Sequence, residues 1–200
     1  MHEKEKQIIQ YLLKQMPSGL TKTELLKAIY LADYESRRYR GNPVSSFEYV
    51  YYHYGPYDQK YSNIIDELVN NEILLEKKFF SASKRHGSAF YLNAQKIQKE
   101  LLTLEDLYIL KYIIREIKLL GNAPLEVLLE QVYETEPMQN VERNQKLNME
   151  QVNNQLRNNN FSLEDIALSE YEYEQGDYIY LEDLERELQN YSVQIDGRKN

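Results

Sequence analysis

Residues 51–57 read Tyr51-Tyr52-His53-Tyr54-Gly55-Pro56-Tyr57, in a chain that contains 19 tyrosines, 5 phenylalanines and no tryptophan. Residues 47–53, which overlap the start of this stretch, show a weak alternation of apolar and polar residues and favour β structure, which predicts a short strand. Gly55 permits backbone geometries that other residues resist, and Pro56 fixes its own φ. We therefore expect this pair to break the strand and to set the directions in which Tyr54 and Tyr57 project.

Helices are predicted on both sides of this turn. Thr21 followed by Glu24 forms a capping-box pattern at the start of the second helix, and Gly41 ends that helix. Apolar residues at helical spacing predict helices over about 3–16, 21–40, 58–70, 104–120 and 124–133. The second helix has an apolar stripe, and the charged residues expected on its exposed face are Asp33, Glu35, Arg37, Arg38 and Arg40.

Two further strands are predicted after the third helix. Residues 73–80 read as a strand, residues 81–88 as a polar turn, and residues 89–93 as the return strand. The order helix, helix, strand, helix and hairpin is that of a winged helix, a likeness of element order alone. The sequence thus predicts a mainly α (α+β) protein, in which a compact helical domain carries a short strand and a small β-hairpin.

The composition is that of a soluble globular protein of 200 residues, with 42% hydrophobic and 28% charged residues. No apolar run approaches the roughly 18 residues that a membrane span needs. The N-terminus lacks the core of a signal peptide, so we expect a cytoplasmic protein. The chain has no cysteine, which excludes disulfides, thiol catalysis and cysteine-bound zinc.

The negative charge is concentrated at the C-terminal end. Residues 161–200 contain 11 acidic and 3 basic residues, a net charge of −8 that equals the charge of the whole chain, so residues 1–160 are neutral. A neutral body with an acidic tail is a poor general binder of nucleic acid. Asparagine fills 8 of the 21 positions from 140 to 160. We expect a domain over 1–135, an Asn-rich linker over 136–160 and a partly ordered, acidic, Tyr-rich extension over 161–200.

The sequence contains no pattern typical of an enzyme. Its three histidines, His2, His53 and His86, have no histidine or cysteine partner at the spacing of metal ligands. The glycines are scattered and form no phosphate-binding loop, and no serine lies in a nucleophile elbow. His53 is expected to have a structural or interface role. We therefore expect no enzyme, no catalytic residue, no cofactor and no metal ion.

Three motifs follow one another at a spacing that identifies a family. A helical motif carries Leu25, Leu26, Lys27, Ile29 and Tyr30; a loop reads Gly41-Asn42-Pro43; and an aromatic strand ends in Tyr52-His53-Tyr54-Gly55-Pro56-Tyr57. This arrangement resembles the Panacea domain of the SocA-like antitoxin family. The resemblance extends over about residues 5–135 and is strongest over 23–74.

The resemblance implies a compact, mainly helical domain that binds a partner protein. The chain would then be an antitoxin or chaperone-like module that neutralises or delivers its partner, in a bacterial toxin–antitoxin system, a phage or a mobile element. The turn could stabilise the fold, or it could form one side of a groove for the partner. The two roles are compatible. The candidate partner-binding residues are Tyr30, Tyr52, His53, Tyr54, Gly55, Pro56 and Tyr57.

Two alternatives stay open at this point. One is a winged-helix DNA-binding regulator, which the neutral charge of residues 1–160 disfavours. The other is a phage-encoded inhibitor of a host defence enzyme, whose acidic tail would mimic a nucleic acid. The sequence predicts neither the identity of the partner nor the oligomeric state.

Overall fold

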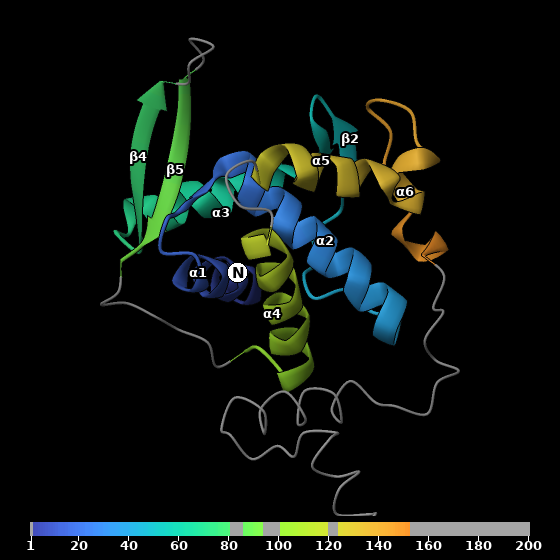
Figure 1. The fold of residues 1–200 in the computed structure, drawn as a ribbon, viewed down its shortest axis with the longest axis horizontal. Coiled ribbons are helices and arrows are strands. Elements are labelled where there is room, and N and C mark those ends of the chain that lie inside the picture. Colours follow the sequence, from blue (N-terminus) through green and yellow to red (C-terminus); the bar gives the residue numbers. More distant parts are fainter. Residues whose placement is uncertain (1, 81–85, 94–100, 120–123, 153–200) are drawn as a thin grey trace, which may run out of the picture. The chain divides into compact units, whose positions relative to one another are not determined.

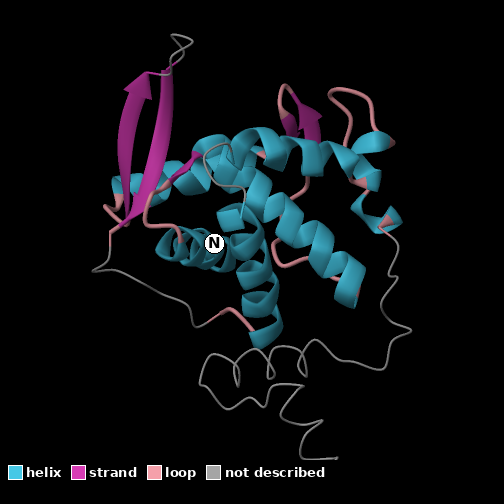
Figure 2. Ribbon diagram, in the orientation of Figure 1, coloured by secondary structure: helices cyan, strands magenta, loops and turns pink. Residues whose placement is uncertain are grey.

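The computed structural model describes residues 2–80, 86–93, 101–119 and 124–152 (Figure 1). The described part is mainly helical, with a small antiparallel sheet and a separate β-hairpin, which confirms the predicted fold class (Figure 2). The helices are α1 (Glu3–Gln15), α2 (Lys22–Arg40), α3 (Gln59–Asn70), α4 (Leu104–Leu119), α5 (Pro124–Glu134) and α6 (Glu136–Gln139), with a 3₁₀ turn at Met149–Gln151. The strands are β1 (Leu20–Thr21), β2 (Val50–Tyr52), β3 (Gly55–Tyr57), β4 (Leu74–Phe80) and β5 (His86–Leu92).

Helix α2 begins and ends where its local sequence predicts. The Thr21 hydroxyl accepts a hydrogen bond from the Glu24 N–H at 3.2 Å, and the Glu24 carboxylate accepts one from the Thr21 N–H at 2.7 Å. These reciprocal bonds satisfy N–H groups that have no partner within the helix. Gly41 ends the helix at a φ of 80°, a left-handed conformation that glycine adopts readily.

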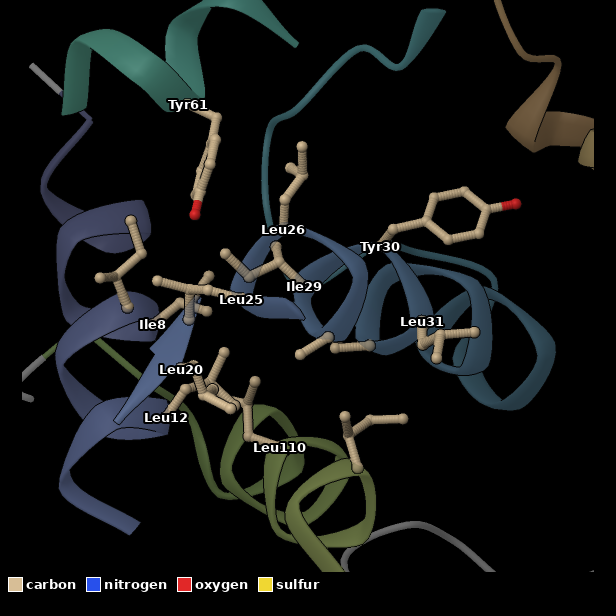
Figure 3. Packing of buried hydrophobic residues seen from close by; sticks show 14 of the residues in the cluster. Ile8, Leu12, Leu20, Leu25, Leu26, Ile29, Tyr30, Leu31, Tyr61 and Leu110 are labelled. Carbon is tan, nitrogen blue, oxygen red and sulfur yellow. The ribbon is translucent and has the colours of Figure 1, made fainter. Parts of the chain in front are cut away.

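The hydrophobic core forms around α2, against which α4 and α5 both pack. Figure 3 shows Leu25 and Ile29 of α2 on the side of α1, whose Ile8 and Leu12 are fully buried. Leu110 of α4 lies beneath them and is also fully buried. Burial of one such side chain contributes about 1.5–3 kcal/mol. Tyr30 extends away from this group (Figure 3).

The three-stranded sheet has the order β1-β5-β4 and is antiparallel throughout. Its hairpin confirms the strands predicted over 73–80 and 89–93, except that the return strand begins earlier, at His86. Strand β1 was not predicted, because its two residues, Leu20 and Thr21, are too few to form a pattern. They pair with Phe90 and Ala89 of β5.

The aromatic turn is a hairpin rather than the end of a strand. The strand expected over 47–53 is confined to β2, and the pair Gly55-Pro56, expected to break it, lies in the partner strand β3. Tyr51 faces Pro56 and Tyr52 faces Gly55 across the pair. Proline is tolerated here because β3 is a short edge strand, where a missing N–H costs no ladder bond. The correction places His53 and Tyr54 at the tip of a two-residue loop.

Residues 144–147 pair with the other edge of β2. The Tyr51 N–H donates to the Gln145 carbonyl at 2.9 Å, and the Asn144 N–H donates to the Tyr51 carbonyl at 2.7 Å. The Leu147 side chain is 3% exposed. The domain boundaries at 135 and 160 stay a prediction, and residues 153–200, which include the acidic extension, lie outside the described residues. None of the described helices combines the length and the apolar character needed to cross a membrane.

Candidate partner-binding site

Five of the seven candidate residues lie together around one pocket. This pocket, which we call the tyrosine pocket, has a volume of about 220 Å³ and opens between the β2–β3 hairpin and the N-terminal half of α2. Pro56 is buried in the hairpin behind it, and Tyr30 lies in the core. The residues that line the tyrosine pocket are Lys22, Thr23, Leu26, Lys27, Tyr52, His53, Tyr54, Gly55, Tyr57 and Tyr61.

The rim of the tyrosine pocket is aromatic and exposed. The side chains of Tyr52 and Tyr54 are 46% and 61% exposed. The Tyr52 ring lies 4.2 Å from the His53 ring and 5.7 Å from the Tyr57 ring, measured between centroids. Tyr57 is half-buried, and its hydroxyl donates to Gln59 at 3.1 Å. These edge-on and tilted contacts join rings that remain open to solvent, as aromatic side chains at protein interfaces are before they bind.

The floor of the tyrosine pocket ties the hairpin to α2 through a buried lysine. The Lys27 ammonium donates to the Pro56 carbonyl at 2.7 Å. Lys27 is 2% exposed, and this burial lowers the pKa of its side chain to about 7. Gly55 lies beside it at a φ of 98°. A Cβ at Gly55 would have room, since it would lie 3.5 Å from the Lys27 nitrogen, so the backbone conformation rather than space requires glycine.

Tyr30 of α2 is fully buried and contacts Tyr49 and Thr135. Its ring meets the Tyr49 ring edge-on, with 5.1 Å between centroids. The Thr135 hydroxyl donates to the Val132 carbonyl at 2.7 Å, so it accepts from the Tyr30 hydroxyl, 2.6 Å away. Burial raises the pKa of Tyr30 above its usual value. The structure therefore gives Tyr30 a position in which it joins α2 to the end of α5, away from the surface of the tyrosine pocket.

We expect Tyr30→Phe to lower the free energy of unfolding by about 1–2 kcal/mol, because it leaves the buried Thr135 hydroxyl without its donor. Urea denaturation followed by circular dichroism measures this loss. Tyr52→Phe removes an exposed hydroxyl and should leave the stability unchanged. Equal stabilities of Tyr30→Phe and the unmodified protein would contradict the assigned hydrogen bond.

A buried carboxylate holds the segment that enters β2. Asp33 is 1% exposed, although the pattern of α2 placed it on the exposed face. It accepts hydrogen bonds from the Ser45 N–H at 2.7 Å, the Ser45 hydroxyl at 2.5 Å and the Tyr49 hydroxyl at 2.6 Å. Burial raises the pKa of Asp33, and these donors oppose that rise. Asp33 thereby positions Tyr49, one residue before β2. Sequence periodicity gave no signal for this role, since it treats every charged residue opposite the apolar stripe as exposed.

Among the residues that the structure describes, no group of three or more histidine, aspartate or glutamate side chains is arranged to hold a metal ion. No curated protein and no solved structure matches the chain. A family model does match it, over residues 25–195, and so extends beyond residue 135, where the resemblance was expected to end. This match covers most of the chain and includes the whole β2–β3 hairpin, so the chain belongs to the family described as "Antitoxin SocA-like, Panacea domain".

Proposed function

We propose that this chain is an antitoxin or chaperone-like module that binds a partner protein at the tyrosine pocket and neutralises or delivers it. Membership of an antitoxin family supports an antitoxin-type role and, in general, a protein partner. The proposed role is one of binding without catalysis, in the cytoplasm, within a bacterial toxin–antitoxin system or a mobile element. The proposed domains are those predicted above, with the acidic extension of residues 161–200 suited to a basic surface on the partner.

The observation that carries the proposal is the pair of exposed tyrosines at the rim of a pocket on a braced hairpin. Tyrosine is enriched at protein interfaces, since its ring contributes apolar area and its hydroxyl a hydrogen bond. The hairpin is held from below by Lys27 and from its other edge by residues 144–147, so the tyrosines lose little freedom on binding. The volume of about 220 Å³ is below the roughly 300–1,000 Å³ of small-molecule sites and suits one side chain of a protein.

The test replaces both rim tyrosines. We expect the double variant Tyr52→Ala, Tyr54→Ala to bind its partner at least about 30-fold more weakly, since exposed aromatic anchors contribute about 2 kcal/mol or more at interfaces. The partner to test first is the product of the adjacent gene, by co-purification and by rescue of growth. The stability of the double variant should stay within about 1 kcal/mol of the unmodified protein, because Tyr52 is 46% and Tyr54 61% exposed.

Leu104→Ala is the matched control. Leu104 is 71% exposed at the first residue of α4 and does not line the tyrosine pocket, so its removal should leave partner binding intact. Unchanged binding by the tyrosine double variant would show that the partner docks elsewhere. Failure of the unmodified chain to bind or rescue against the product of any adjacent gene would overturn the antitoxin proposal. Binding to a host defence enzyme instead would favour the phage inhibitor.

A DNA-binding regulator is the alternative that one observation favours. The described elements follow one another in the order of a winged helix, with helices α1, α2 and α3 before the β4–β5 hairpin. The exposed face of α3 opposes this function, because it carries Asp66 and Glu67 and would repel phosphates. Glu67 also forms an ion pair with Lys6, with 2.6 Å between the Lys6 nitrogen and the Glu67 oxygen, so this lysine is not free to contact a phosphate. A gel shift on the chain's own promoter at low salt tests the alternative, and the absence of a shift removes it.

A further inference from the structure

The β4–β5 hairpin presents an unpaired strand edge. The sheet has the order β1-β5-β4, so among the residues that the structure describes β4 pairs only with β5. The hairpin projects beyond the helices, with β4 on its outer side (Figure 1). Residues 75–79 of β4 are all exposed. An exposed strand edge carries backbone N–H and C=O groups that can pair with another chain.

The pairing with β5 determines which residues of β4 have their backbone groups at the free edge. The Asn93 N–H donates to the Ile73 carbonyl at 3.0 Å, and these two residues lie opposite each other one position beyond the paired strands. Hydrogen-bonded pairs recur at every second residue of an antiparallel ladder. The odd-numbered residues of β4 therefore turn their N–H and C=O groups to β5. The even-numbered residues, which include Glu76 and Lys78, turn theirs to the free edge.

The charges of β4 favour one register with a second copy of the same strand. Two copies related by a two-fold axis pair antiparallel, and their even-numbered residues must face each other. An axis at Glu76 or at Lys78 sets that residue opposite itself, and like charges directly opposite each other are destabilising. An axis at Lys77 instead sets Glu76 of each copy opposite Lys78 of the other. The Ser88 hydroxyl occupies one oxygen of Glu76, at 2.5 Å, and leaves the other oxygen for this lysine.

The same register matches apolar side chains on the other face of β4. Leu75 and Phe79 are 49% and 39% exposed, and the axis at Lys77 sets each of them opposite the other residue in the second copy. Lys77 lies opposite its own copy at the axis. Its ammonium is 4.7 Å from the centroid of the Tyr91 ring of β5, so this contact draws the charge away from the free edge.

We propose that β4 pairs with β4 of a second copy of this chain, antiparallel and with the two-fold axis at Lys77, and so forms a dimer with one continuous sheet. Lysine on an edge strand opposes pairing with other chains. Because Glu76 of the second copy lies opposite Lys78, this edge accepts its own copy and disfavours a strand without an acidic residue at that position. The tyrosine pocket contains no residue of β4, so the dimer does not depend on the proposed antitoxin function.

Sedimentation velocity of the full-length chain, from about 1 to about 500 µM, measures this association. We expect a dimer with a dissociation constant on the order of 10 µM, because a contact between two strand edges is smaller than a standard interface. Glu76→Lys and Lys78→Glu should each weaken the dimer at least about 10-fold, since each sets like charges opposite each other twice. The control is Glu126→Lys, the same change of charge at an exposed position of α5, which should leave the dimer unchanged.

Two combinations of these variants test the register. The double variant Glu76→Lys, Lys78→Glu restores opposite charges in both pairs and should dimerise as the unmodified chain does. An equimolar mixture of the two single variants should form a mixed dimer, because one copy then carries two lysines and the other two glutamates at the paired positions. Both recoveries require residues 76 and 78 to face each other, and neither would follow if the single variants had failed to fold.

Three outcomes would overturn the proposal. A chain that is still monomeric at about 500 µM would leave the β4 edge to a strand of another protein or to the acidic extension. A dimer that Glu76→Lys does not weaken would assign the contact to another surface. Failure of either recovery would exclude the register with its axis at Lys77. None of these measurements includes a toxin, so a failure here is distinguishable from a failure of the proposed function.

Discussion

Asp33→Ala is expected to lower the free energy of unfolding by about 3–4 kcal/mol, a large part of the stability of a domain of this size. The substitution removes the acceptor of three buried hydrogen bonds, two from Ser45 and one from Tyr49. Each donor left in the interior without an acceptor costs about 1–3 kcal/mol. The small side chain also leaves a cavity where the carboxylate stood. Urea denaturation followed by circular dichroism measures the loss.

Asp33→Asn separates the shape of the carboxylate from its capacity to accept hydrogen bonds. The amide keeps the volume and one acceptor oxygen, so we expect a smaller loss of about 1–2 kcal/mol. The control is Asp66→Ala, which removes an exposed carboxylate of α3 and should change the stability by less than about 0.5 kcal/mol. A loss for Asp33→Ala no greater than for Asp66→Ala would show that the Asp33 network does not hold the segment before β2.

Local sequence signals were sufficient for the helix boundaries and the main hairpin. The capping box at Thr21 and the left-handed Gly41 act within a few residues of the helix ends, so they are visible without knowledge of the tertiary structure. The β4–β5 hairpin likewise joins neighbouring segments. The clustering of Tyr52, Tyr54 and Tyr57 around one pocket also followed from their proximity in the chain.

The hydrophobic periodicity of the sequence could not predict contacts between segments that are distant in the chain. Asp33 was placed on an exposed face because periodicity reports one apolar stripe, whereas the loop that carries Ser45 covers a second side of α2. The pairing of residues 144–147 with β2 joins segments almost a hundred residues apart. The asparagine content of residues 140–160 predicted a linker there. The ion pair of Arg40 with Glu105, 65 residues along the chain, likewise depends on tertiary contacts.

Lys27 should make the stability rise with pH in the neutral to mildly alkaline range. Burial lowers its pKa in the folded protein to about 7, from the ordinary value of 10.5. Between these values the unfolded chain binds more protons than the folded one, so the free energy of unfolding increases with pH. Below pH 7 the lysine is charged in both states and the cost of burying the ammonium is fully present. From pH 7 to pH 9 we expect this group to add about 2 kcal/mol of stability.

Comparison with Lys27→Met isolates this contribution, because methionine fills a similar volume and carries no charge. The difference in free energy of unfolding between the unmodified protein and Lys27→Met should shift by about 2 kcal/mol in favour of the unmodified protein between pH 7 and pH 9. The control is Lys22→Met, at a partly exposed lysine of the same pocket, for which that difference should stay constant. If the difference in free energy of unfolding for Lys27→Met is also constant between pH 7 and pH 9, the Lys27 ammonium remains hydrated in the folded protein. The bond from Lys27 to the Pro56 carbonyl would then lie in contact with water, and the hairpin that presents Tyr52 and Tyr54 would be held less firmly than the burial of Lys27 indicates.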